Sequence, residues 1–208
     1  MEFLDARRLT GPNLLAHEAG AILDIRCAAS EVPRVVASFE KHLRVVIEAV
    51  GWQQPMLVHR KLAGGVSLFF RAPIDVLYSA SAISEWAWAL VDAELNGAAE
   101  PDFAEKLLET GEAISEEANG TLLALEAAAK QNQVAFLWDD EFVSLGHGKH
   151  AAVWPVRELP EAVSLEWKRF AEIPLALVTG TNGKTTTVRL AAHILRGGGQ
   201  NVGVSSTT

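Results

Sequence analysis

The stretch "VTGTNGKTTTVRLAAHIL", residues 178–195, is the most informative part of this chain. A buried-type strand, "PLALVTG" at residues 174–180, leads into its glycines, and a helical run follows them. A further strand is predicted to begin at "NVGVSSTT", residues 201–208. The order strand, glycine loop, helix and strand is typical of a βαβ unit, whose strands are parallel. The C-terminal part is therefore predicted to be α/β.

The glycine loop predicts a phosphate site. Two glycines let the backbone approach an anion closely, and N–H groups at the helix start point at phosphate oxygens. The predicted nucleotide-binding residues are Gly180, Thr181, Asn182, Gly183, Lys184, Thr185 and Thr186. Lys184 is the predicted catalytic residue because its ammonium can reach the β- and γ-phosphates, and the Thr185 hydroxyl is the predicted Mg²⁺ ligand.

The pattern G-x-x-x-x-G-K-[ST] is not met in full, because Val178 stands at its first glycine. The other interpretation is a plain glycine turn with a solvated lysine. The strand before the loop and the helix after it favour phosphate binding.

"TGTNGKTTT" closely resembles the ATP loop of the Mur ligase superfamily, and the full 178–195 stretch is most similar to the loop of cyanophycin synthetases. Two upstream stretches support that branch. "RRLTGPNLLAHEAGAILDI", residues 7–25, resembles the start of those proteins. "TLLALEAAAKQNQVAFLWDDEFVSLGHGKHAAVW", residues 121–154, resembles the segment that leads into their ATP-grasp domain.

The resemblance implies an ATP- and Mg²⁺-dependent ligase. Such enzymes convert a carboxylate to an acyl-phosphate, which an amine attacks to give an amide with release of ADP and phosphate. The implied partners are ATP and an amino-acid, peptide or polymer substrate. The sequence departs from the cyanophycin synthetase pattern in two places. Only about thirty residues separate "LGHGK" from the loop, so the ATP-grasp module looks absent. The helix predicted at 74–95 lacks the histidines that the resemblance leads us to expect there.

No Asp or Glu follows Lys184 to complete a metal site. The chain is therefore interpreted as the N-terminal portion of a Mur-type ligase, inactive alone. The alternative is a stand-alone binding or regulatory protein with a vestigial phosphate loop.

Three parts are predicted: an α+β domain at 1–97 resembling the cyanophycin synthetase N-terminus, a helix pair with short strands at 98–160, and a connector with the truncated start of the ATP-binding domain at 161–208. The fold class is α/β, with N-terminal α+β domains before an incomplete Mur-type βαβ unit.

Helices are predicted at 32–50, 74–95, 101–116 and 120–131, with a helical connector at 157–173. Strands are predicted at 2–9, 17–27, 133–138, 141–146 and 150–156, and a hairpin at 55–73 with its bend at Gly64-Gly65.

Charge and composition narrow the function. The net charge is −8, and residues 72–172 carry six basic and nineteen acidic side chains, which argues against a nucleic-acid binder. No apolar run is long enough for a membrane span, and "MEFLDARRLTG" lacks the apolar region of a signal peptide. The single cysteine, Cys27, fits a reducing compartment, so a cytoplasmic location is predicted. The sequence leaves the oligomeric state open.

Other motifs favour structural roles. "GHGK" at 146–149 is a hairpin turn rather than a second anion site, because its glycines suit turn geometry. Asp139-Asp140-Glu141 is interpreted as an acidic turn rather than a metal site, and the six histidines show no metal-ligand spacing. Asn119 is predicted to cap the helix that follows it.

Overall fold

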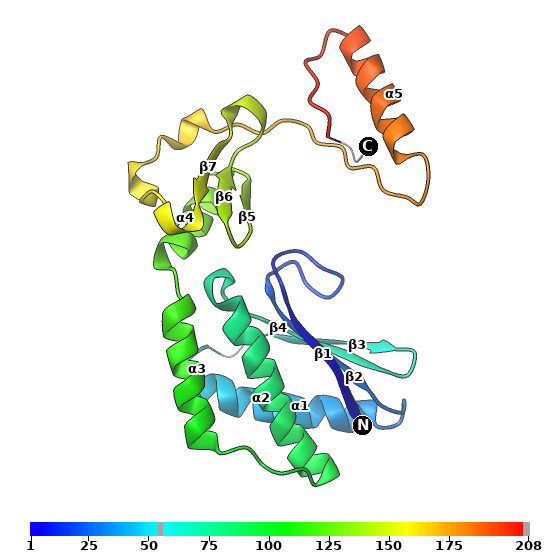
Figure 1. Ribbon diagram of the computed structural model, residues 1–208, viewed down its shortest axis with the longest axis vertical. Helices are drawn as coiled ribbons and strands as arrows, with labels where there is room; N and C mark the ends of the chain where they lie inside the picture. The colour runs from blue at the N-terminus through cyan, green and yellow to red at the C-terminus, as the bar shows by residue number, and fades with distance from the viewer. Residues whose placement is uncertain (54–55, 206–208) are drawn as a thin grey trace. The chain divides into compact units, whose positions relative to one another are not determined.

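The computed structural model describes residues 1–53 and 56–205 and divides into two compact units, Met1–Leu125 and Glu126–Thr208 (Figure 1). The domain boundaries after residues 97 and 160 remain predictions.

Unit 1 contains a four-stranded antiparallel sheet in the order β1-β2-β4-β3. The strands are β1 (Glu2–Leu9), β2 (Gly20–Arg26), β3 (Leu57–Leu62) and β4 (Gly65–Arg71). The first two predicted strands and the hairpin are thus confirmed, although Pro55 of the predicted hairpin lies outside the described residues. Gly64 has φ +87°, a left-handed conformation that glycine adopts without steric cost and that closes the β3–β4 turn.

The helices of unit 1 are α1 (Val32–Ala49), α2 (Leu77–Asn96) and α3 (Phe103–Glu117), and α4 (Gly120–Gln131) begins at its end. A 3₁₀ turn, η1 (Ile74–Val76), precedes α2, so the predicted helix at 74–95 is confirmed with a tighter first turn. Helices α1 and α2 pack against each other and against the sheet (Figure 1). The core is apolar and centred on Phe39, Leu23 and Ile83, each fully buried.

Cys27 follows β2 and lies in this core. Burial disfavours the thiolate and raises the pKa of its thiol. The thiol is therefore a weak nucleophile near neutral pH.

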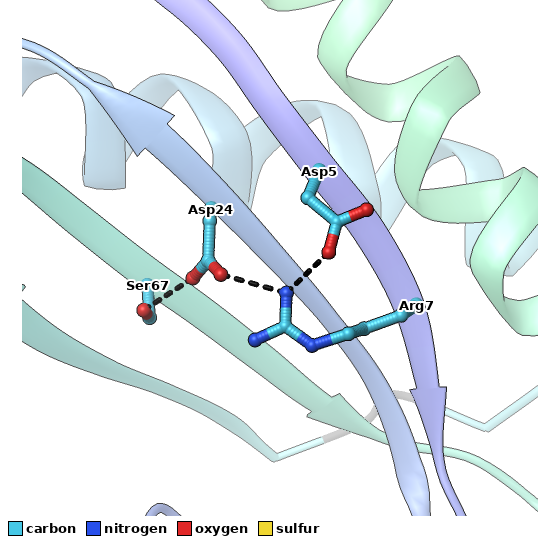
Figure 2. A network of polar contacts seen from close by, with 4 residues as sticks. All are labelled: Asp5, Arg7, Asp24 and Ser67. Carbon is cyan, nitrogen blue, oxygen red and sulfur yellow. Dashed lines mark hydrogen bonds and ion pairs between the residues drawn. The ribbon is translucent and has the colours of Figure 1, made fainter.

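A polar network crosses three strands of the sheet (Figure 2). Asp24 on β2 is paired with Asp5 on one side and Ser67 on the other, so the three side chains share a face. Arg7 donates from one nitrogen to Asp5 at 2.6 Å and to Asp24 at 2.7 Å, and the Ser67 hydroxyl donates to the second oxygen of Asp24. Cross-strand contacts of this kind hold the strand register.

Two carboxylates tie the helices of unit 1 together. Glu117, the last residue of α3, accepts hydrogen bonds from the backbone N–H groups of Tyr78 at 2.7 Å and Ser79 at 2.8 Å in the first turn of α2. In return, Asp75 before α2 accepts from the N–H of Asn119 at 2.9 Å. The C-terminal end of α3 and the N-terminal end of α2 are thus joined by hydrogen bonds in both directions. The Asn119 side chain accepts from the N–H of Leu122, which confirms its predicted capping role.

A second tie joins α1 to α2. Glu94 accepts from Ser38 at 3.0 Å and Lys41 at 2.9 Å and lies 2.6 Å from the Nε2 atom of His42. Hydrogen bonds from Lys41, His42 and Ser38 lower the pKa of Glu94 to about 2. The carboxylate is therefore charged throughout the physiological range.

Unit 2 contains a small antiparallel sheet in the order β5-β6-β7, formed by β5 (Phe136–Trp138), β6 (Phe142–Leu145) and β7 (Ala152–Pro155). The three predicted strands are confirmed, each shorter than expected. One face of the sheet buries Val143 and Leu145. The ring of Trp154 lies edge-on to that of Phe170, with centroids 6.3 Å apart.

Three predictions for the C-terminal part are wrong. The connector at 157–173 is not an α-helix but contains three 3₁₀ turns, η3 (Val156–Glu158), η4 (Ala162–Ser164) and η5 (Trp167–Arg169). Residues 174–180 form no strand, and the described residues 201–205 form none either; the rest of that predicted strand lies outside the described residues. The predicted βαβ unit is therefore not formed within the described chain.

The physical reason is the lack of strand partners. A strand satisfies its backbone N–H and C=O groups through a neighbour, and residues 174–180 pair with none among the described residues. Their side chains remain in water: Leu177 is 99% exposed and Leu175 is 65% exposed. The helix that follows is nevertheless present as α5 (Lys184–Gly197), because a helix makes its hydrogen bonds internally.

Candidate phosphate-binding loop

The glycine loop at 180–183 turns the extended chain into α5 (Figure 1). Gly180 has φ +146° and Gly183 has φ +80°, and both values lie in the region that favours glycine. Gly183 is the N-cap of α5, and its carbonyl accepts the helical bond from the N–H of Thr187 at 2.9 Å. Open space surrounds the position that a Cβ atom of Gly183 would occupy. The loop therefore leaves its backbone accessible.

Lys184 is the first residue of α5, and its side chain folds back over the loop. Its ammonium donates to the carbonyl oxygen of Gly180 at 2.6 Å, and the side chain is exposed. The cation thus lies beside the same glycines that expose the loop backbone. A phosphate entering the loop would exchange this neutral carbonyl for a charged oxygen, which is the stronger acceptor.

The start of α5 suits an anion. The first N–H groups of a helix have no acceptors inside it, and the helix dipole places partial positive charge there. The first turn of α5 contains no acidic residue, and neither does any later position of the sequence. The start of α5 therefore favours phosphate, and the residues present fit that group.

The same residues do not complete a Mg²⁺ site. Thr185, half-buried in the first turn, offers one hydroxyl oxygen, whereas Mg²⁺ prefers six oxygen ligands that usually include a carboxylate. No group of three His, Cys, Asp or Glu side chains able to hold a metal ion occurs in residues 1–53 and 56–205. A metal bound at Thr185 would need its remaining ligands from the nucleotide, water or residues outside this loop.

The "GHGK" and acidic motifs have structural roles. Gly146 and Gly148 have positive φ, and a Cβ atom on Gly148 would meet the Ile173 side chain at 3.0 Å. The N–H of His147 donates to the carbonyl of Ala171 at 2.9 Å, so this turn packs against the connector. The Asp139 carboxylate accepts from the N–H groups of Glu141 and Phe142, which closes the β5–β6 turn.

Sequence reasoning missed a small pocket in unit 2. Its residues come from two segments about thirty-five positions apart, 132–134 and 167–172. No local motif connects such segments, because only the packing of the connector brings them together. The one local signal of this pocket in the sequence is Gln133, a glutamine at the position where a helix ends.

Comparison with known proteins gives short matches. The chain is 62% identical over 37 residues to the cyanophycin synthetases of Synechocystis sp. and Geminocystis herdmanii, which covers 18% of this chain and 4% of each relative. It is 47% identical over 45 residues to the UDP-N-acetylmuramoylalanine–D-glutamate ligase of Nitratidesulfovibrio vulgaris, which covers 22% of this chain and 10% of that protein.

No family model matches the chain. The chain spans no more than a tenth of the length of these relatives. Within the described residues, no helix is both long and apolar enough to cross a membrane. The short matches support a resemblance to Mur-type ligases over about a fifth of the sequence.

Proposed function

We propose that this chain is the N-terminal portion of an ATP-dependent amide-forming ligase of Mur type, and that residues 180–186 bind the phosphates of ATP. The observation that carries the proposal is the loop itself: two glycines in positive-φ conformations, a lysine ammonium beside them, and an acid-free helix start. The short matches to cyanophycin synthetases and to a peptidoglycan ligase support the reaction class.

Each loop residue has a distinct role in this proposal. Backbone N–H groups from Gly180 to Thr186 hold phosphate oxygens, and the glycines keep side chains out of the way. Lys184 leaves the Gly180 carbonyl and neutralises charge on the β- and γ-phosphates. The Thr185 hydroxyl would be the loop's ligand to Mg²⁺, and the ion would supply further positive charge against the phosphates.

Catalysis is proposed to need more than this loop. The reaction joins a carboxylate to an amine of an amino acid, peptide or polymer, and its transition state requires compensation of charge on the transferred phosphoryl group. The described residues provide one cation and no acidic metal ligand in the region of the loop. We therefore expect the 208-residue chain to bind nucleotide without turning it over. A cytoplasmic location belongs to the same proposal.

The test is a titration of the purified chain with ATP, with and without Mg²⁺, by isothermal calorimetry. Lys184→Ala removes a charge-assisted contact to phosphate, which corresponds to about 1.5–3 kcal/mol or roughly 10- to 150-fold in Kd. Arg189→Ala is the matched control, because it removes the same charge from the second turn of the same helix. ADP release is measured in parallel.

Equal loss of affinity in the two variants would mean that general charge, not the loop, attracts the nucleotide. No ATP binding at all would favour the alternative of a binding or regulatory protein with a vestigial loop. Sustained ADP release that Lys184→Ala abolishes would contradict the expectation that the chain is inactive alone.

A further inference from the structure

A pocket of about 170 Å³ lies in unit 2, away from the glycine loop in sequence. It is lined by Asn132, Gln133, Val134, Trp167, Lys168, Phe170, Ala171 and Glu172. Pockets for drug-sized ligands measure about 300–1,000 Å³, so this one suits a ligand of only a few heavy atoms. Nothing assigned to the phosphate loop involves these residues.

The pocket has an apolar floor and a polar rim. Phe170 is buried and Trp167, Val134 and Ala171 are half-buried, whereas the four polar residues of the lining are exposed. The rings of Trp167 and Phe170 meet edge to face with centroids 5.9 Å apart. The indole N–H donates to the carbonyl of Ala162 at 3.0 Å, which fixes the orientation of Trp167. The floor is therefore held in place independently of any ligand.

Gln133 is strained on the pocket wall. Its φ is +55°, and it is the one non-glycine residue with positive φ within residues 1–53 and 56–205. The N–H of Gln133 donates to the carbonyl of Lys130, and the N–H of Val134 donates to that of Ala129. These bonds form the helix end in which glycine, or less often asparagine, is the usual residue. A long side chain thus occupies a position where glycine is less strained, and Gln133 is one of the residues that line the pocket.

The lining includes two residues of opposite charge that do not neutralise each other. Lys168 and Glu172 form no ion pair or side-chain hydrogen bond with any residue in the described part of the chain. A lysine offers three donors to a carboxylate, and a glutamate accepts from an ammonium. The Asn132 side chain donates to the carbonyl of Ala128 at 2.8 Å, which leaves its amide oxygen as an acceptor, and Gln133 adds a second amide to the lining.

From this combination we propose that the pocket binds a small zwitterion, of the size of a free α-amino acid. Its carboxylate would pair with Lys168 and its ammonium with Glu172, while its aliphatic part rests on Trp167 and Phe170. The assignment is independent of nucleotide binding by the loop at 180–186.

The experiment uses the ¹⁵N-labelled 208-residue chain and NMR titration with L-alanine, acetate and methylammonium as separate probes. The expected result is a saturable shift of the Trp167 indole and Gln133 side-chain signals by L-alanine, with binding at least about tenfold tighter than that of either single-charge probe. No saturable shift below about 20 mM L-alanine would overturn the proposal. Equal binding of acetate or methylammonium would also overturn it, because a single charge would then suffice.

Variants separate the ligand role from a structural one. Lys168→Gln is expected to weaken L-alanine binding about fivefold or more, and Lys149→Gln, with the same loss of charge outside the pocket, to leave it unchanged. Gln133→Gly relieves the backbone strain, so it should raise Tm while weakening binding. If Gln133→Gly has a higher Tm and binds L-alanine as well as the wild type, Gln133 does not contact the ligand. If Lys168→Gln also binds L-alanine as well as the wild type, the proposed site is refuted.

Discussion

Removal of the Glu117 carboxylate should loosen α2 from its first turn onward. The carboxylate accepts from two N–H groups, those of Tyr78 at 2.7 Å and Ser79 at 2.8 Å, which have no acceptor within the helix. It also places negative charge at the positive end of the helix dipole. Because Glu117 ends α3, the same bonds fix α3 against α2.

The expected cost of Glu117→Ala is about 2 kcal/mol of unfolding free energy. Loss of a helix cap costs about 0.5–2 kcal/mol, and hydrogen bonds to a charged acceptor lie at the upper end of that range. Both bonds lie partly in solvent, which prevents a larger value. Glu117→Gln keeps one carbonyl oxygen as an acceptor and should cost about 1 kcal/mol. A chain of this size loses roughly 2–4 °C in Tm for each kcal/mol.

The assay is urea denaturation followed by circular dichroism, combined with hydrogen exchange of the Tyr78 and Ser79 amides. Glu116→Ala is the matched control: the neighbouring glutamate is exposed, forms no side-chain bond with a described residue, and should change stability by no more than about 0.5 kcal/mol. Equal destabilisation by the two alanine variants, or unchanged exchange of the two amides in Glu117→Ala, would refute the capping role.

Lowering the pH should weaken the tie between α1 and α2, because the folded-state pKa of Glu94 is about 2 against its ordinary value of 4.5. The stability that this interaction contributes is complete above about pH 4.5 and is lost as the pH falls towards 2. In that window, a plot of unfolding free energy against pH should therefore be flatter for Glu94→Gln than for the wild type. Parallel plots for the two proteins would contradict this prediction. Phe39→Ala empties a fully buried site and should cost about 3–5 kcal/mol in urea denaturation, and a loss below 1 kcal/mol would show that the site collapses or is already wet. Amides of residues 175–179 should exchange far faster than those of α2, and equal protection would show that the segment has a strand partner.

Local patterns in the sequence predicted the elements of unit 1 well. The helix at 32–50 was predictable because its apolar residues repeat with helical spacing and Pro33 suits a first turn. The β3–β4 hairpin was predictable because Gly64 offers the left-handed conformation that its turn requires. In both cases the information lies within a few residues of the element.

The C-terminal part shows where such reasoning fails. The run at 174–180 has the composition of a buried strand, but a strand depends on partners that no local pattern supplies. The glycine loop was predictable because its conformation is set by Gly180 and Gly183 themselves. The hydrogen bond from Lys184 to the Gly180 carbonyl was not predictable, since whether the ammonium donates to a loop carbonyl or to water depends on the final geometry.

The burial of Cys27 has a practical consequence for labelling. The chain has one cysteine, and its thiol is both covered by the core of unit 1 and held protonated by that environment. A maleimide reagent at neutral pH should therefore leave the native protein unmodified. A cysteine introduced at the exposed position Thr187 would react alone, so a fluorophore or spin label could report on the glycine loop without removal of the native thiol.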